Sequence, residues 1–127
     1  MNMTNVLVLD DQHELFFEDL ERLQRAMRSG HGASVVPELV QRLTSYAAMH
    51  CPTEERLMQS YEYPLRDTHA VEHVKFRQGL RAIERAVQDQ DVTAAIQLLD
   101  RMIRWQHEHI ERWDAMLGAF LNERGVK

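Results

Sequence analysis

Histidines and carboxylates recur along this chain at helical spacing. His50 and Glu54 are four residues apart, and so are His69 and His73. Side chains at this spacing lie on one face of a helix. Imidazole and carboxylate are standard metal ligands, and burying such groups without partners costs about 1–3 kcal/mol each. The pattern therefore predicts a buried metal site.

Three more residues extend this set towards both ends of the chain. His13 lies near the N-terminus, and His109 and Asp114 lie near the C-terminus, five residues apart. A spacing of five spreads two side chains further around a regular helix than a spacing of four. His31 and His107 fall off the apolar pattern, so we expect both to be solvated.

Four helices are expected to position these side chains. Helix-favouring residues are plentiful, glycine and proline number only five and three, and alternating β-branched runs are nearly absent. We predict helices over the ranges of about 12–28, 36–60, 67–87 and 93–122. Short connections between amphipathic helices predict an all-α fold, an antiparallel up-down-up-down four-helix bundle, with residues 1–127 as a single domain.

Helix ends and buried faces follow from the same patterns. Asp11 with Glu14 resembles a capping box for the first helix, and Asp67 is a plausible N-cap of the third. The apolar stripe of the fourth helix is expected to contain Leu99, Met102, Gln106, His109, Trp113, Met116 and Phe120.

In such a bundle the metal-binding candidates fall at one shared level. Seven ligands are too many for one ion and suit two. Two octahedral ions offer twelve positions: five histidines fill five, two bridging carboxylates (Glu54 and Asp114) fill four, and a bridging oxygen fills two. One position stays open, which suits a small diatomic ligand or peroxide rather than a bulky substrate.

Composition excludes several other classes of protein. The chain has 127 residues and a formal net charge of −5, which argues against a nucleic-acid partner. Its single cysteine, Cys51, excludes an internal disulfide framework, and no apolar run approaches the roughly 20 residues of a membrane span. We expect no membrane insertion and a reducing, cytoplasmic setting; no surface feature identifies a protein partner.

Four motifs together resemble those of the hemerythrin family in its bacterial single-domain form. They are Asp11-Gln12-His13, His50-x-x-x-Glu54-Glu55-x-x-Met58, His69-x-x-x-His73-x-x-Phe76 and Trp105-x-x-x-His109-Ile110-x-x-x-Asp114. The resemblance implies that the protein binds dioxygen reversibly at a non-haem di-iron centre and is not an enzyme. It also implies three histidines on one iron (His69, His73, His109), two on the other (His13, His50), and bridging by Glu54 and Asp114.

The chain departs from this family at the expected ligand pocket. Cys51 stands where relatives often carry an aromatic residue, and Gln106 stands where they usually carry an aliphatic one. With Trp105 and Ile110, these residues are expected to line the pocket. We hypothesise that Gln106 and Cys51 make it wetter and shorten the life of the oxygen-bound state. Glu55 is a candidate to support a ligand from outside.

Alternative functions remain open on the sequence alone. A ferritin-like site uses Glu-x-x-His pairs, and no Glu precedes any His by three residues here. A mononuclear zinc site needs only four ligands. A di-iron peroxidase or a scavenger of nitric oxide or peroxide, an iron store, and a metal-free interaction bundle are the remaining alternatives to reversible oxygen binding.

Overall fold

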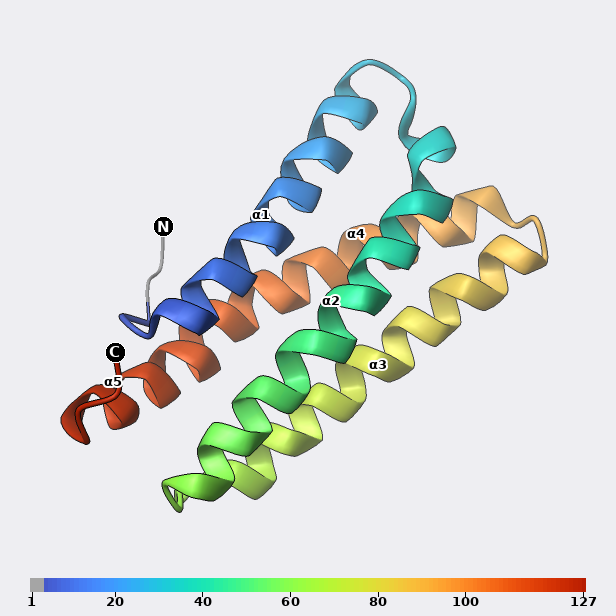
Figure 1. Cartoon of the computed structure of the whole chain (residues 1–127). Coiled ribbons are helices and arrows are strands. Elements are labelled where there is room, and N and C mark those ends of the chain that lie inside the picture. Colours follow the sequence, from blue (N-terminus) through green and yellow to red (C-terminus); the bar gives the residue numbers. More distant parts are fainter. Residues whose placement is uncertain (1–3) are drawn as a thin grey trace.

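Long helices account for nearly all of the computed structural model, which describes residues 4–127 (Figure 1). Within those residues there is no strand, which is consistent with the predicted four-helix bundle. The first three helices are α1 (Leu7–Arg28), α2 (Gly32–Ser60) and α3 (Arg66–Gln88). The fourth rod consists of α4 (Val92–His109), a π-helical segment η1 (Ile110–Asp114) and α5 (Ala115–Glu123).

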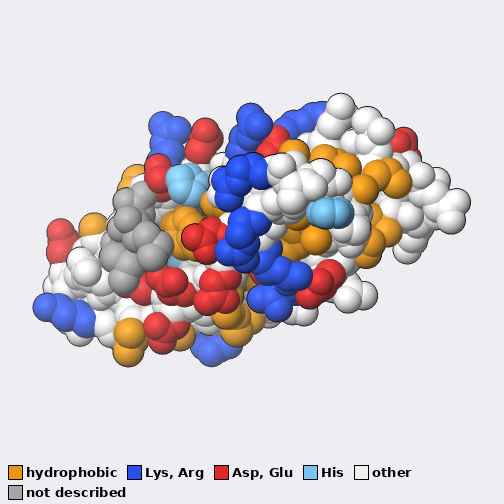
Figure 2. Space-filling model, turned by 90° about the horizontal axis from the view of Figure 1, so that it is seen from above, with side chains coloured by type: hydrophobic (Ala, Val, Ile, Leu, Met, Phe, Trp, Pro, Cys, Tyr) orange, Lys and Arg blue, Asp and Glu red, His pale blue; other side chains and the backbone are white. Residues whose placement is uncertain are grey.

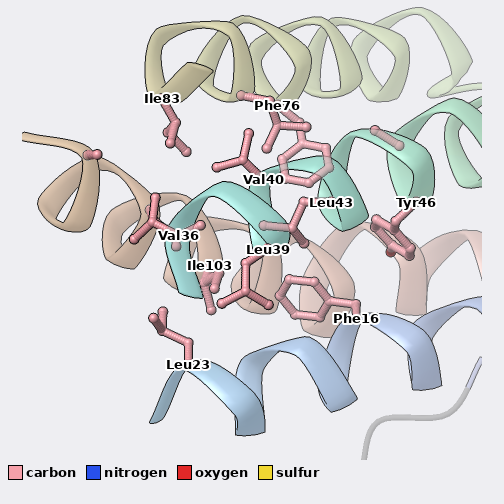
Figure 3. Packing of buried hydrophobic residues seen from close by; sticks show 14 of the residues in the cluster. Phe16, Leu23, Val36, Leu39, Val40, Leu43, Tyr46, Phe76, Ile83 and Ile103 are labelled. Carbon is pink, nitrogen blue, oxygen red and sulfur yellow. The ribbon is translucent and has the colours of Figure 1, made fainter. Parts of the chain in front are cut away.

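Consecutive helices pack against each other along the chain. α1 contacts α2, α2 contacts α3, α3 contacts α4, and α2 also contacts α4. Two apolar clusters fill the interior. The larger one, the main core, includes Phe16, Leu43, Phe76 and Ile103, contributed by α1 to α4 (Figure 3). The smaller one, the second core, consists of Val6, Leu9, Met58, Tyr63, Leu117 and Leu121.

The predicted caps of the first and third helices are wrong. α1 begins at Leu7, so Asp11 and Glu14 lie inside it. Its start is held instead by Asp10, whose Oδ1 accepts hydrogen bonds from the Thr4 backbone N–H (2.7 Å) and hydroxyl (2.8 Å). A carboxylate in the first turn also interacts favourably with the helix dipole.

The other helix boundaries shift by only a few residues. α2 begins at Gly32, before the expected start, so Pro37 lies inside the helix rather than in its first turn. α3 begins at Arg66, and its N-cap position is Leu65, not Asp67. Asp91, which was not predicted as a cap, caps α4, because its side chain accepts a hydrogen bond from the Ala94 backbone N–H at 3.1 Å.

The buried face of the fourth rod changes register at η1. Leu99, Gln106 and His109 are buried as predicted, but Met116 is 41% exposed and Phe120 is only partly buried. Leu117 and Leu121 take their place in the second core. A π-turn accommodates one extra residue, so every position after it moves by one relative to a regular helix.

The outer surface has charges of both signs together with exposed apolar side chains such as Leu7, Val71 and Val92. Lys and Arg side chains lie beside Asp and Glu on the face seen in Figure 2. Among the described residues, no helix combines the length and the hydropathy that crossing a bilayer demands.

Candidate metal centre

The structure brings the seven predicted ligand residues together in the interior. They come from α1, α2, α3, α4 and η1, and each is at most 3% exposed: His13, His50, Glu54, His69, His73, His109 and Asp114. By contrast His31 is exposed, and the His107 side chain is 41% exposed and lies 3.3 Å from Glu111. Burial therefore separates the predicted cluster from the two histidines expected to be solvated.

The cluster divides into two groups that share both carboxylates. One group contains three histidines (His69, His73, His109), and the other contains two (His13, His50). Glu54 and Asp114 belong to both groups, and the candidate ligand atoms within each lie within 4.8 Å of one another. This arrangement fits two ions bridged by two carboxylates.

Asp114 directs its two oxygens to different groups. Its Oδ2 lies 2.8 Å from His13 Nε2 and 3.3 Å from His50 Nε2. Its Oδ1 lies 3.1 Å from His69 Nε2 and 3.0 Å from His109 Nε2. One carboxylate oxygen per group is the geometry expected of a bridging carboxylate.

Glu54 contacts histidines of both groups through a single oxygen. Its Oε1 is 2.9 Å from His73 Nε2, 3.1 Å from His69 Nε2 and 3.2 Å from His50 Nε2. Its Oε2 is buried and has no hydrogen-bond partner among the described residues.

The π-helical segment explains how His109 and Asp114 share the cluster despite a spacing of five. His109 ends α4, and Asp114 ends η1. Because π-helices join residues five apart, they align side chains that a regular α-helix would splay apart. π-turns occur frequently at functional sites, and this one aims a bridging carboxylate.

Two of the histidines are oriented by acceptors at their outer nitrogen. His50 Nδ1 lies 2.8 Å from Gln12 Oε1, and Gln12 Nε2 in turn donates to the Thr53 hydroxyl at 3.1 Å. His73 Nδ1 lies 2.9 Å from Glu55 Oε2. An acceptor at Nδ1 favours the tautomer whose Nε2 lone pair is free for a metal.

Charges within the cluster support one another. Burial opposes the imidazolium of His50 and of His69, but the facing Glu54 and Asp114 carboxylates outweigh it. They raise the pKa of His50 to about 10 and that of His69 to about 9. Burial likewise opposes ionisation of both carboxyls, yet the surrounding imidazoles hold the pKa of Glu54 and of Asp114 well below the usual range.

Several buried ligand atoms lack hydrogen-bond partners among the described residues, which shows that the cluster fits metal ions. Glu54 Oε2, Asp114 Oδ1 and His109 Nε2 are buried and lack hydrogen-bond partners within residues 4–127. His109 Nε2 and Asp114 Oδ1 lie 3.0 Å apart without hydrogen bonding. Buried polar atoms are nearly always satisfied, and cations at the centre would satisfy these.

Three of the four predicted pocket residues contact the main core, a cluster histidine or a neighbour of one. Trp105 stacks on His109, with ring centroids 5.3 Å apart and planes at 16°. Ile110 is buried in the main core. Gln106 is buried and donates from Nε2 to the Tyr46 hydroxyl at 3.1 Å.

Cys51, the fourth predicted pocket residue, is buried beside His73 and Glu55. Burial, with the nearby Glu54 charge, raises the pKa of its thiol to about 12. The sulfur therefore stays protonated at neutral pH, as is typical of a small buried apolar side chain.

Sequence reasoning missed two residues that support the cluster. Gln12 precedes His13 directly and orients His50 from α1. Tyr46 lies four residues before His50, and its ring stacks on that imidazole at 5.1 Å and 11°. The helical spacing of Tyr46 was the available signal, whereas nothing in the sequence pairs Gln12 with a residue of α2.

The fold and the site thus define a helical protein with a buried cluster of histidines and carboxylates. Comparisons with known proteins identify its family. The family model described as "Hemerythrin HHE cation binding domain" matches residues 4–121. A bacteriohemerythrin of Methylococcus capsulatus (strain Bath) is 30% identical over 127 residues, covering 94% of this chain and 90% of that protein. No solved structure matches significantly.

The chain belongs to the hemerythrin family. The resemblance inferred from the four sequence motifs is therefore confirmed.

Proposed function

We propose that this protein binds dioxygen reversibly at a di-iron centre. The observation that carries the proposal is the pair of buried groups, three histidines and two histidines, that share Glu54 and Asp114. Membership of the hemerythrin family and the likeness to a protein named bacteriohemerythrin support the same function.

The proposed ligands are those of the sequence prediction. His69, His73 and His109 would hold one iron, and His13 and His50 the other. Glu54 and Asp114 would bridge the two ions. Bound iron would supply the electrons that dioxygen binding needs, and histidine-rich ligation favours binding over oxidation of organic substrates.

The protein supplies positioning and exclusion of water. Gln12 and Glu55 orient His50 and His73, while Trp105 and Ile110 cover the main-core side of the cluster. Glu55 is the one ionisable side chain among these four groups, and it is engaged with His73, so we propose a binding protein rather than an enzyme.

The predictions of helix topology, domain organisation, cellular location and ligand are also part of this proposal. Short connections between successively packed helices support an antiparallel up-down-up-down bundle with residues 1–127 as one domain. The cytoplasmic setting rests on composition. The proposed ligand is dioxygen or another small diatomic molecule.

Anaerobic reconstitution tests the function. The metal-free protein is loaded with ferrous iron, iron is counted per chain, and optical spectra are taken through oxygenation and purging with inert gas. We expect about two irons per chain, as the two donor groups require, and an absorption band that appears with oxygen and disappears on purging. His107→Ala, outside the cluster, should behave like the original protein.

A colourless sample, or one holding fewer than two irons, would contradict the proposal. The polar contact between Gln106 and Tyr46 favours one second candidate, a di-iron peroxidase or a scavenger of nitric oxide or peroxide. Sustained turnover of peroxide with a reductant, without a reversible oxygen band, would select that alternative.

A further inference from the structure

Tyr46 is a buried phenol that lies directly against the cluster. Tyr46 is 3% exposed, and its ring lies nearly parallel to the His50 imidazole. Two aromatic rings also pack near it: Phe16 lies 5.8 Å and Phe76 6.3 Å away between ring centroids. Figure 3 shows Tyr46 on α2 at the edge of the main core.

The phenol is joined to Gln106, which comes from α4 on the other side of the interior. Gln106 Nε2 lies 3.1 Å from Tyr46 Oη, and both residues are buried. A phenol and a carboxamide together carry three donor hydrogens, and their mutual hydrogen bond uses one, whichever way the amide is turned. Two donor hydrogens remain.

Among residues 4–127, their mutual contact is the only side-chain hydrogen bond that either group makes. The neighbouring main-core residues, such as Leu43 and Ile103, offer only apolar side chains. An unmade hydrogen bond at a buried donor is costly, so a ligand or water that accepts it is favoured here.

The pair lies next to the group that has fewer side chains. That group contains His13 and His50 with the two shared carboxylates, whereas the other contains three histidines. Tyr46 lies one helical turn before His50 and covers its ring. A metal held by His13 and His50 would therefore keep a free position for an external ligand near this phenol.

We propose that Tyr46 and Gln106 form a hydrogen-bond donor pair that selects small ligands whose outer atom accepts a hydrogen bond. Linear anions of two or three atoms belong to this class. The inference rests on the proposed function, because it assigns the pair to the external-ligand side of the same centre. Tyr46 and Gln106 are positioning residues that orient the ligand without holding a metal.

Azide titration of the iron-loaded, air-oxidised protein tests the pair. The dissociation constant for azide is measured from the optical change in the original protein and in Tyr46→Phe, Gln106→Leu and the double variant. Each single substitution should raise Kd roughly tenfold, the equivalent of one hydrogen bond. The double variant should bind little more weakly than either single variant, because each change already breaks the pair.

Tyr63→Phe is the matched control. Tyr63 is also a buried tyrosine whose hydroxyl has no hydrogen-bond partner among residues 4–127, but it belongs to the second core. This variant should leave the Kd for azide unchanged, and iron content should stay the same in every variant. If Tyr46→Phe fails to fold, Gln106→Leu decides alone.

The outcomes separate this inference from the proposed function. Azide binding that is absent, or equal in the original protein and both single variants, overturns the donor pair but leaves the di-iron centre standing. Equal weakening by Tyr63→Phe also overturns it. A protein that loads no iron overturns both proposals.

Discussion

The outer nitrogens of the cluster histidines have different surroundings. His73 faces the Glu55 carboxylate and His50 faces the Gln12 amide, whereas Nδ1 of His13, His69 and His109 has no hydrogen-bond partner among residues 4–127. Glu55 itself is half-buried and lies 3.9 Å from Arg77. A charged acceptor both orients an imidazole and raises its basicity, so His73 is expected to depend most on its partner.

Removing the Glu55 carboxylate should weaken metal binding without removing a ligand. We expect Glu55→Ala to lower metal affinity about 10- to 100-fold, and Glu55→Gln, which keeps an acceptor, to lower it less. Competition with a chelator measures the affinities. Glu14→Ala, at an exposed position of α1, is the control. Equal affinities in Glu55→Ala and the control would show that His73 is oriented by packing alone.

At the residue scale the sequence predicts which side chains face inward better than it predicts what they contact. Spacings of four place His50 with Glu54 and His69 with His73, and the structure brings all seven candidates together. Contacts between helices, such as Gln12 with His50 or Gln106 with Tyr46, depend on how neighbouring rods are rotated. One-dimensional spacing contains no information on that rotation.

At the element scale, η1 separates the part of the fourth helix that was predicted correctly from the part that was not. Regular periodicity predicted Met116 and Phe120 inside, but Leu117 and Leu121 occupy the second core. The spacing of five between His109 and Asp114 was the visible signal. In a π-turn those two residues align, and the apolar face that follows shifts by one position.

Deleting one residue within η1 should therefore be tolerated. Without the exposed Arg112, His109 and Asp114 become four apart, and a regular α-helix again places them on one face. The register of Leu117 with the second core is kept as well. We expect this deletion variant to retain both metal ions and its helical circular dichroism.

Deleting the exposed Glu108 is the matched control, because it lies in regular α-helix just before His109. Its loss rotates His109 by about 100° relative to Gln106 and the rest of α4. Metal binding should be lost. The π-turn interpretation fails if the two deletions have equal effects on metal content.

At the scale of the whole molecule, the cluster is a polar layer between two apolar cores. Along α1, His13 lies between Leu9 of the second core and Phe16 of the main core. Glu54 on α2 and Asp114 on η1 likewise lie between residues of the main core and residues of the second core. Without metal, the buried carboxylates of this layer are balanced only by protonated histidines. Metal binding and the stability of the fold are therefore expected to be linked.

Removing metal should lower the thermal midpoint of unfolding, and by more at high pH. Metal present at about 100 times its Kd contributes roughly 2.7 kcal/mol, which corresponds to about 10 °C for a chain of this size. The raised pKa values of His50 (about 10) and His69 (about 9) stabilise the metal-free fold fully below pH 6.5. That contribution is lost as pH rises towards 9–10, because the folded state then gives up protons that the unfolded state has already released.

The difference in thermal midpoint between metal-loaded and metal-free protein should therefore widen from pH 6.5 to pH 9.5. Calorimetry on matched samples measures this difference. Asp114→Asn is the control, because it removes one of the two carboxylates shared by the groups and should narrow the gap at every pH. A gap that stays constant with pH would mean that His50 and His69 hold no extra protons in the metal-free fold. The polar layer would then be kept in place by the two apolar cores rather than by charge pairing within it.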